Sequence, residues 1–335
     1  MWEIVAEALP GLEELAAQEV GALTGAGRRL RFQYAGDLGA LLGLRLVQSV
    51  YLVVAVRAAR PTALLGDQHL RRLEQAIRAA RGLHPRDAFR TFRLGAAGHS
   101  SSTFRRLAAA LQERTALAYD QQEGDLLVRV RRSEEGWEAL VRLSPRPLTA
   151  RAWRVRDMPG ALNAGIAAAM VRLTDPDPRD RFANLLCGSG TLLVERLLAA
   201  PAGQAVGFDV DREALEAARE NLEAAGLSGR IDLVRADAGC LPCADGAFEA
   251  LTADLPYGDL VGSHGDNRHL YPRMLREAAR VAAPAARMVL VTQDIRLLEG
   301  CLAEVRQLWE PERRLRVFQG GHRPEVTVLR RLAGA

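Results

Sequence analysis

The stretch Asn184-Leu-Leu-Cys-Gly-Ser-Gly-Thr191 decides the fold of this chain. It follows a short apolar run, residues 182–186, that predicts a β-strand, and it leads into a predicted helix over residues 191–200. Glycines at positions 188 and 190 let the backbone pass close beneath a ligand at the carboxyl end of the strand. The stretch therefore predicts a ligand-binding turn in an α/β domain.

Two acidic residues follow at the ends of the next two predicted strands. Asp209 lies 21 residues beyond Gly188, where a doubly wound sheet places a carboxylate that binds ribose hydroxyls. Asp237, followed by Ala238, ends the third strand, where its carboxylate can accept the exocyclic amine of adenine. Leu193 stands where a dinucleotide site has its third glycine, which favours a nucleoside cofactor without phosphates. Together these features predict S-adenosylmethionine, although the glycines alone also fit a structural turn and Asp209 alone fits a helix cap.

Strands and helices alternate through the C-terminal half. The predicted strands cover residues 182–186, 205–209, 231–235, 247–253, 287–292 and 325–330, and the predicted helices cover residues 191–200, 212–225 and 270–281. This alternation is typical of a doubly wound, mostly parallel sheet with helices on both faces. We therefore expect a Rossmann-like α/β domain.

The first half has a different texture. Its predicted strands cover residues 4–8, 51–58, 89–94, 126–131 and 137–143, and its predicted helices cover residues 12–23, 70–80 and 103–118. This pattern indicates two α+β modules, with a break near Arg60-Pro61. Ser144-Pro-Arg-Pro147 interrupts both periodicities and marks the exit from this half.

The two halves also differ in charge. Arginine supplies all 45 basic side chains of the 335-residue chain, which contains no lysine. Residues 1–158 hold 24 Arg and 17 acidic residues, a net charge of +7, whereas the remainder holds 21 and 24, a net charge of −3. Arginine stays charged and binds phosphate oxygens in a bidentate manner, so the first half suits nucleic acid. A solvated arginine face is the alternative that charge alone leaves open.

Composition excludes several classes of protein. With 48% hydrophobic and 26% charged residues, the chain is neither disordered nor fibrous. Residues 1–20 do not resemble a signal peptide, and the most apolar stretch, residues 47–56, is too short to span a bilayer. The four cysteines do not make a disulfide framework, and Cys240 and Cys243 lack further ligands at zinc spacing. We expect a cytoplasmic protein that uses neither metal nor membrane.

The segment Asp254-Leu-Pro-Tyr-Gly258 ends the fourth strand of the predicted sheet. It is a variant of the Asn/Asp-Pro-Pro-Phe/Tyr motif of enzymes that methylate planar amines. The Asp254 carboxylate and the Leu255 carbonyl can hold both N–H bonds of a weakly nucleophilic amine, while Pro256 makes the turn rigid. Tyr257 can stack on the target base, which contributes about 1–3 kcal/mol. We predict Asp254, Leu255, Pro256 and Tyr257 as the catalytic residues, although an ordinary structural turn can have the same sequence.

These motifs resemble those of the THUMP-domain class I methyltransferases that make N2-methylguanosine in tRNA. Residues 184–195 resemble that family's cofactor motif, residues 254–258 with Leu270-Tyr-Pro272 resemble its catalytic loop, and residues 320–326 resemble its terminal hairpin. Asn184-Leu185 stands in place of the family's usual Asp-Pro, and Leu255 replaces the first proline of the commoner Pro-Pro pair.

The resemblance implies an architecture and a set of binding residues. The expected domains are a ferredoxin-like segment (1–60), a THUMP RNA-binding domain (61–150), a linker (151–162) and a class I methyltransferase domain with a C-terminal antiparallel hairpin (163–335). The expected contacts to S-adenosylmethionine come from Asn184, Cys187, Gly188, Gly190, Thr191, Glu195, Asp209, Val210, Asp237, Ala238 and Asp254. The expected contacts to the acceptor end and stem of tRNA come from Arg90, Arg93, His99, Arg105, Arg106, Arg146, Arg151 and Arg154.

The same resemblance implies the reaction. Guanine 6 of the acceptor stem is the preferred target, guanine 10 of tRNA is the next, and a ribosomal RNA guanine is the third. Two alternatives from other classes remain: a protein glutamine N-methyltransferase, whose planar amide suits a similar motif, and a non-catalytic RNA-binding protein. Because no heptad seam or long apolar edge is visible, we expect a monomer.

Overall fold

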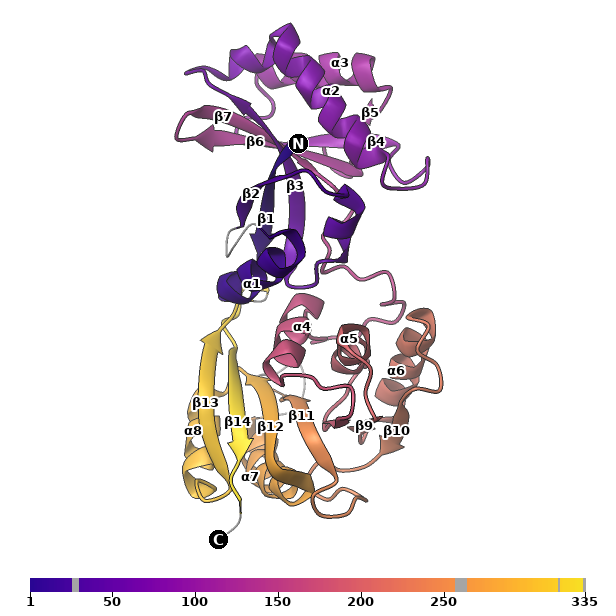
Figure 1. Ribbon diagram of the computed structural model, residues 1–335, viewed down its shortest axis with the longest axis vertical. Helices are drawn as coiled ribbons and strands as arrows, with labels where there is room; N and C mark the ends of the chain where they lie inside the picture. Colours follow the sequence, from indigo (N-terminus) through magenta and orange to yellow (C-terminus); the bar gives the residue numbers. More distant parts are fainter. Residues whose placement is uncertain (26–29, 257–263, 319, 334–335) are drawn as a thin grey trace. The chain divides into compact units, whose positions relative to one another are not determined.

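The computed structural model describes residues 1–25, 30–256, 264–318 and 320–333, and it divides into two compact units. The N-terminal unit comprises residues 1–8 and 13–149, and the C-terminal unit comprises residues 9–12 and 150–335. Figure 1 shows the helices and strands of both units with their labels.

The N-terminal unit is built on one seven-stranded sheet with the order β2-β1-β3-β7-β6-β4-β5. The strands are β1 (Trp2–Ala8), β2 (Arg31–Tyr34), β3 (Val47–Val56), β4 (Thr91–Ala96), β5 (Ala118–Tyr119), β6 (Leu126–Ser133) and β7 (Gly136–Arg142). The helices are α1 (Glu13–Thr24), α2 (Asp67–Arg81) and α3 (Ser102–Thr115), with short 3₁₀ turns at Leu38–Gly43 and Pro61–Leu65. Because β3 pairs with both β1 and β7, the sheet continues through the predicted break at Arg60-Pro61.

The two faces of this sheet differ in chemistry. The face beneath α2 and α3 is apolar and includes Leu52, Val141 and Val128, which are register partners on three neighbouring strands. The opposite face combines an apolar cluster, which includes Tyr51 and Leu140, with buried charge. The buried carboxylate of Glu138 accepts hydrogen bonds there from Arg31 and Arg131 at 2.8 and 2.7 Å. These guanidiniums hold the pKa of Glu138 below its usual range against the effect of its burial. A buried carboxylate of this kind is stable because it is paired on both sides.

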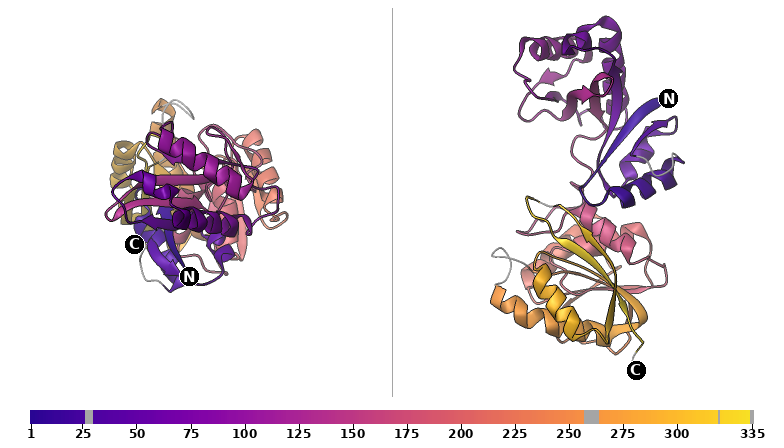
Figure 2. Two further views of the ribbon diagram at one scale, coloured as in Figure 1. Left: turned by 90° about the horizontal axis from the view of Figure 1, so that it is seen from above. Right: turned by 90° about the vertical axis from the view of Figure 1, so that its left-hand side faces the viewer.

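The C-terminal unit has the predicted doubly wound architecture. Its sheet has the order β10-β9-β8-β11-β12-β14-β13, parallel except for β14, which runs antiparallel to both β12 and β13. The strands are β8 (Arg181–Asn184), β9 (Gln204–Asp209), β10 (Asp232–Arg235), β11 (Phe248–Asp254), β12 (Ala282–Thr292), β13 (Trp309–Arg316) and β14 (Glu325–Arg331). The helices are α4 (Ala164–Leu173), α5 (Thr191–Ala199), α6 (Arg212–Ala224), α7 (His264–Val281) and α8 (Ile295–Glu304). Figure 2 shows the strands of this sheet from the side of β13.

Two apolar layers cover the sheet of the C-terminal unit. On one face, Tyr271, Met274 and Leu275 of α7 pack with Leu251 and Ala253 of β11. On the other face, α4, α5 and α6 contribute to a second layer that contains Ala164, Leu193 and Leu222. The carboxyl ends of the parallel strands lie between these two helical layers, and a Rossmann-like fold places its ligand site at these ends.

The observed elements extend beyond those predicted. The predicted helix at residues 270–281 begins already at His264, and the predicted strand at residues 287–292 begins at Ala282. Helix α4 gives no helical period because eight of its ten residues are buried, so it has no polar face. Strand β13 is an edge strand in which charged residues predominate, which hides its β pattern but protects the sheet edge from pairing with another chain.

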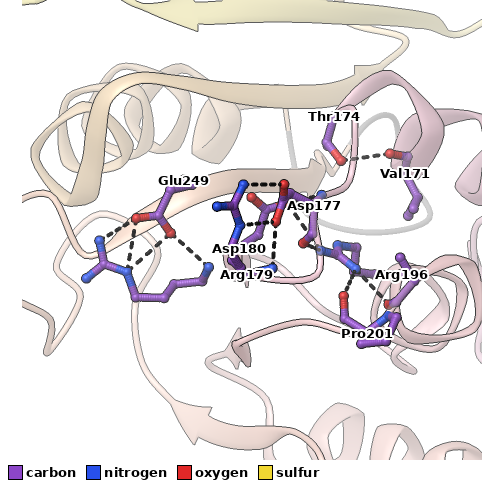
Figure 3. A network of polar contacts seen from close by, with 10 residues as sticks. Val171, Thr174, Asp177, Arg179, Asp180, Arg196, Pro201 and Glu249 are labelled. Carbon is purple, nitrogen blue, oxygen red and sulfur yellow. Dashed lines mark hydrogen bonds and ion pairs between the residues drawn. The ribbon is translucent and has the colours of Figure 1, made fainter.

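A buried arginine stabilises the end of α5 (Figure 3). Arg196 donates from Nη1 to the carbonyls of Ala200 and Pro201 at 2.8 and 2.9 Å, and from Nη2 to the carbonyl of Asp177 at 2.8 Å. Its Nη2 also lies 3.2 Å from the carboxylate of Asp180. The guanidinium thus joins the end of α5 to the loop before β8.

Candidate active site

The cofactor turn Cys187–Gly190 connects β8 to α5 and is tied to the neighbouring strand. The Cys187 N–H donates to the carbonyl of Phe208 at 2.8 Å, and the Gly188 N–H donates to Asp209 Oδ2 at 2.8 Å. Asp209 Oδ1 accepts from the Asp211 N–H at 3.0 Å. These contacts orient the Asp209 carboxylate toward the turn, and each oxygen keeps a lone pair for a hydroxyl group.

The two glycines of the turn have different surroundings. Gly188 has φ +49°, and a Cβ there would meet no atom within 4 Å. Gly190 has φ +80°, and a Cβ there would lie 3.0 Å from the Cβ of Ala218 on α6. The space above Gly188 is therefore open toward a ligand, whereas Gly190 allows α5 and α6 to pack closely.

Cys187 contributes size rather than reactivity. Its side chain is buried, and this burial raises the pKa of the thiol well above its usual value. The thiol therefore stays protonated at neutral pH. Cys240 is exposed and Cys243 is half-buried, and both are free cysteines. Among the described residues, no cluster of three or more His, Cys, Asp or Glu side chains could hold a metal ion.

Asp237, the carboxylate predicted to bind adenine, follows β10. Asp237 Oδ1 accepts from the Gly239 N–H at 2.8 Å, and Oδ2 accepts from Arg273 at 2.8 Å. The Gly239 hydrogen bond, followed by Arg273, lowers the pKa of Asp237, so this carboxylate is ionised at neutral pH. Val210, next to Asp209, is 54% exposed and offers an apolar surface to a ring, while Ala238 is buried.

Asp254 ends β11 on the same face of the sheet as Thr252, whose register partner is Asn184. The Asp254 side chain is only half-buried, but its Oδ1 is fully covered and has no hydrogen-bond partner among the described residues. The side-chain oxygen and nitrogen of Asn184 and the hydroxyl of Thr252 are also buried, and they have no hydrogen-bond partner among the residues that the structure describes. Burial raises the pKa of Asp254 from 3.8 to about 7.

The turn after Asp254 is held from α7 and β12. The Leu255 N–H donates to the carbonyl of Val291 at 3.0 Å. The Pro256 carbonyl accepts two hydrogen bonds, from Tyr271 Oη at 2.8 Å and from Asn267 Nδ2 at 2.9 Å. Tyr257 and Gly258, the last residues of the predicted motif, lie outside the described residues. The structure thus fixes the first three catalytic candidates in one turn.

Some predicted ligand residues have protein partners instead. Glu195 is completely buried and accepts a hydrogen bond at 2.9 Å from Arg151, whose side chain is only 8% exposed. Arg154 donates to Thr191 Oγ1 at 3.0 Å and to the carbonyl of Leu162 at 2.7 Å. This burial argues against the predicted RNA contacts of Arg151 and Arg154. Glu195, being fully buried, supports α5 through Arg151, whereas the Thr191 hydroxyl accepts from Arg154 and still has its own O–H to donate.

The remaining predicted RNA-binding residues lie on the surface of the N-terminal unit. Arg93 is half-buried in β4, and five others are exposed: Arg90, His99, Arg105, Arg106 and Arg146. Arg105 and Arg106 share the first turns of α3, and His99 precedes this helix. These exposed cations are compatible with contacts to phosphate.

Sequence reasoning missed two asparagines that stabilise the site. Asn221 of α6 is fully buried; its Oδ1 accepts from the Val155 and Arg156 N–H groups at 2.9 Å, and its Nδ2 donates to the Ser189 carbonyl at 2.9 Å. It thereby joins residues 155–156 to the cofactor turn. A polar residue in the apolar stripe of α6 was the available signal, whereas Asn267 gave none in the sequence.

The C-terminal unit also has a pocket formed by other residues. A pocket of about 570 Å³ runs along β9 and β10, and its lining extends from Gln204 at the start of β9 to Phe208 near the end of this strand. None of the residues predicted to bind the cofactor is among those that line it. None of the helices in the described ranges is long and apolar enough to cross a membrane.

The sheet of the C-terminal unit has the strand order 3-2-1-4-5-7-6. A glycine turn follows its first strand, acidic residues follow the next two strands, and an Asp-Leu-Pro turn follows the fourth. This combination defines a class I methyltransferase. Residues 151–325 match the family model described as UPF0020, RMKL-like methyltransferase domain. The chain belongs to this methyltransferase family, and S-adenosylmethionine is the cofactor that it uses. The open space above Gly188 beside the Asp209 carboxylate fits a nucleoside cofactor.

Individual relatives extend the similarity to the whole chain. The tRNA (guanine(6)-N2)-methyltransferase of Thermus thermophilus is 32% identical over 99% of this chain and 100% of its own length. The crystal structure of TrmN from Thermus thermophilus superposes with a TM-score of 0.76 and 29% identity, covering 99% of this chain and 100% of that one. The human tRNA (guanine(6)-N(2))-methyltransferase THUMP3 is 31% identical over 51% of this chain, and the match spans 36% of the human protein.

Proposed function

We propose that this protein transfers a methyl group from S-adenosylmethionine to N2 of a guanine in tRNA, and that the target is guanine 6 of the acceptor stem. The observation that carries the proposal is the buried Oδ1 of Asp254, which has no partner among the described residues and can accept an N–H bond. The relatives reported above, which are named for this reaction, support it. Guanine 10 of tRNA remains the second candidate, since a relative from Methanothermobacter thermautotrophicus named for that position is 29% identical over 44% of this chain.

The Asp254 turn performs the chemistry by positioning the amine. The exocyclic amine of guanine is a poor nucleophile because its lone pair is delocalised into the ring. The Asp254 carboxylate and the Leu255 carbonyl accept hydrogen bonds from its two N–H groups and direct the lone pair toward the methyl donor. When bound, S-adenosylmethionine supplies a sulfonium methyl group with a good leaving group.

The bond changes balance without a strong base. Held by the turn at Gly188 and by the Asp209 carboxylate, S-adenosylmethionine would supply the methyl group to N2, and the electrons of the broken S–CH₃ bond would stay on a neutral thioether leaving group. The methylated nitrogen then loses one proton, which the Asp254 carboxylate can accept because its pKa lies near 7. Most of the rate enhancement comes from holding nucleophile and donor in line.

The N-terminal unit would bind the RNA. We assign residues 1–60 to a ferredoxin-like segment and residues 61–150 to a THUMP domain, followed by a linker (151–162) and the methyltransferase domain (163–335). The exposed cations Arg90, His99, Arg105, Arg106 and Arg146 would contact phosphates of the acceptor end. A tRNA substrate also suits a cytoplasmic protein.

The test uses the purified full-length protein, labelled S-adenosylmethionine and a tRNA transcript, followed by nucleoside mass spectrometry and fragment mapping. We expect N2-methylguanosine at position 6, and replacement of guanine 6 by adenine should abolish the label. Label at guanine 10 would favour the second candidate, and label in adenosine or cytidine would overturn the guanine assignment. Asp254→Ala should abolish transfer while tRNA affinity stays within about twofold, because the RNA contacts lie in the other unit.

A further inference from the structure

The adenine-side carboxylate is held by a residue that the cofactor motifs do not contain. Arg273 Nη2 lies 2.8 Å from Asp237 Oδ2, while the Gly239 N–H lies 2.8 Å from Oδ1. Both oxygens therefore have a donor from the protein, which fixes the rotation of the carboxylate. Each oxygen still has a lone pair, so an amine can be recognised in one defined direction.

Gly239 makes room for this arginine. A Cβ at position 239 would lie 3.0 Å from Nη2, 3.1 Å from Cζ and 3.1 Å from Cβ of Arg273. The guanidinium therefore packs directly on the bare backbone of Gly239. The turn from Asp237 is closed by the Cys240 N–H, which donates to the Asp237 carbonyl at 2.8 Å. Two features of the same turn, a glycine and a carboxylate, thus fit one guanidinium.

Arg273 belongs to α7, the helix that also contacts the proposed catalytic turn Asp254–Pro256. Tyr271 and Asn267, two and six residues earlier on α7, donate to the Pro256 carbonyl. The same helix therefore contacts the turn that would present the guanine and the turn that would present the adenine. Pro272, inside α7, separates the two sets of contacts.

We propose that Arg273 is a positioning residue for recognition of the 6-amino group of the cofactor's purine, acting through Asp237. This inference rests on the proposed placement of the adenine at Asp237. The ion pair is about half exposed, with 54% of the Arg273 side chain and 43% of the Asp237 side chain accessible. Exposed pairs contribute little to folding stability, so its value lies in orienting the carboxylate.

The test measures binding of two ligands to the full-length protein by calorimetry: S-adenosylhomocysteine, and its 6-oxo analogue S-inosylhomocysteine. The wild type should prefer the 6-amino ligand. Arg273→Ala should weaken binding of S-adenosylhomocysteine about tenfold, the effect of one charged hydrogen bond, and reduce the preference. Gly239→Ala should act in the same direction by displacing the guanidinium.

Arg276→Ala is the matched control. Arg276 lies on the same helix, is 55% exposed and pairs with Glu304 at 3.3 Å, so its loss removes the same charge without touching Asp237. It should leave both affinities within about twofold. If Arg273→Ala leaves the ligand preference unchanged, or weakens both ligands equally, the positioning role is wrong. If the wild type binds neither ligand, the cofactor assignment itself is wrong.

Discussion

The hydroxyl of Tyr271 lies 2.8 Å from the carbonyl oxygen of Pro256 and donates a hydrogen bond to it. Tyr271 is fully buried in α7, and Thr292 of β12 holds the same hydroxyl at 2.7 Å. The turn Asp254–Pro256, which we propose to be catalytic, therefore rests on a helix and a strand that lie in the core of the domain. A proline at position 256 limits the backbone, and the tyrosine fixes which way its carbonyl points.

Tyr271→Phe should lower kcat about tenfold while binding of S-adenosylhomocysteine changes little. The substitution removes both hydrogen bonds of the hydroxyl, to the Pro256 carbonyl and with Thr292, and each costs about 1 kcal/mol. Among the described residues, Asn267 remains as a donor to the Pro256 carbonyl. Single-turnover methylation of tRNA measures the effect. Tyr51→Phe is the control, because Tyr51 is equally buried and its hydroxyl loses hydrogen bonds with Glu7 and Ser49 in the other unit. An equal loss of activity in both variants would contradict the assigned role.

The rate of methyl transfer should rise with pH through about 7. Burial raises the pKa of Asp254 to about 7, and only the ionised carboxylate accepts both its hydrogen bond and the released proton. Burial also raises the pKa of Tyr271 above its usual value, so this neighbour stays protonated throughout. Single-turnover rates from about pH 6 to about pH 8, with cofactor affinity measured in parallel, test the prediction. A flat profile would show that ionisation of Asp254 does not limit the reaction.

Asp254→Asn should stabilise the protein at alkaline pH. The folded state raises the pKa of Asp254 from 3.8 to about 7, so between these values it binds a proton that the unfolded chain releases. The free energy of unfolding of the wild type therefore falls, relative to that of Asp254→Asn, as pH rises from about 4 to about 7. Denaturant unfolding at several pH values measures the difference. A constant difference would contradict the raised pKa.

Alanine substitutions at the two glycines of the cofactor turn should separate folding from binding. Gly190→Ala combines φ +80° with a contact of 3.0 Å to Ala218 and should cost about 2 kcal/mol or more of stability. Gly188→Ala has no such clash, so it should cost less stability but weaken S-adenosylhomocysteine binding by placing a methyl group in the open space. Thermal unfolding and calorimetry give the two readouts. The opposite ranking would contradict the assignment of these positions.

Arg151→Ala should act on stability and Arg105→Ala on RNA binding. Arg151 pairs with the fully buried Glu195, and breaking a buried pair costs about 3–5 kcal/mol. Arg105 is exposed on α3, so its loss should leave stability unchanged and reduce the salt dependence of tRNA binding. Unfolding curves and filter binding at several salt concentrations distinguish them. Normal stability of Arg151→Ala would restore Arg151 as an RNA-contact candidate.

The local patterns that could be predicted are those set by neighbouring residues. Alternation of apolar runs predicted nearly every parallel strand of the C-terminal unit, and the glycines at 188 and 190 predicted the turn that the structure shows. Strand β13 and helix α4 were missed because one is charged along an exposed edge and the other is buried on all sides. Neither has the two-sided environment that produces a periodic pattern.

The sequence by itself determined the doubly wound class of the C-terminal sheet, the class of cofactor and the position of the Asp254 turn after the fourth strand. These follow from spacing along the chain, since the carboxyl ends of parallel strands meet at one edge. Only the tertiary structure decided which arginines are exposed and which are buried. It also decided that α7 contacts both Pro256 and Asp237. The partners Arg151–Glu195 and Arg273–Asp237 are 44 and 36 residues apart, and packing of the core, rather than any local pattern, brings them together.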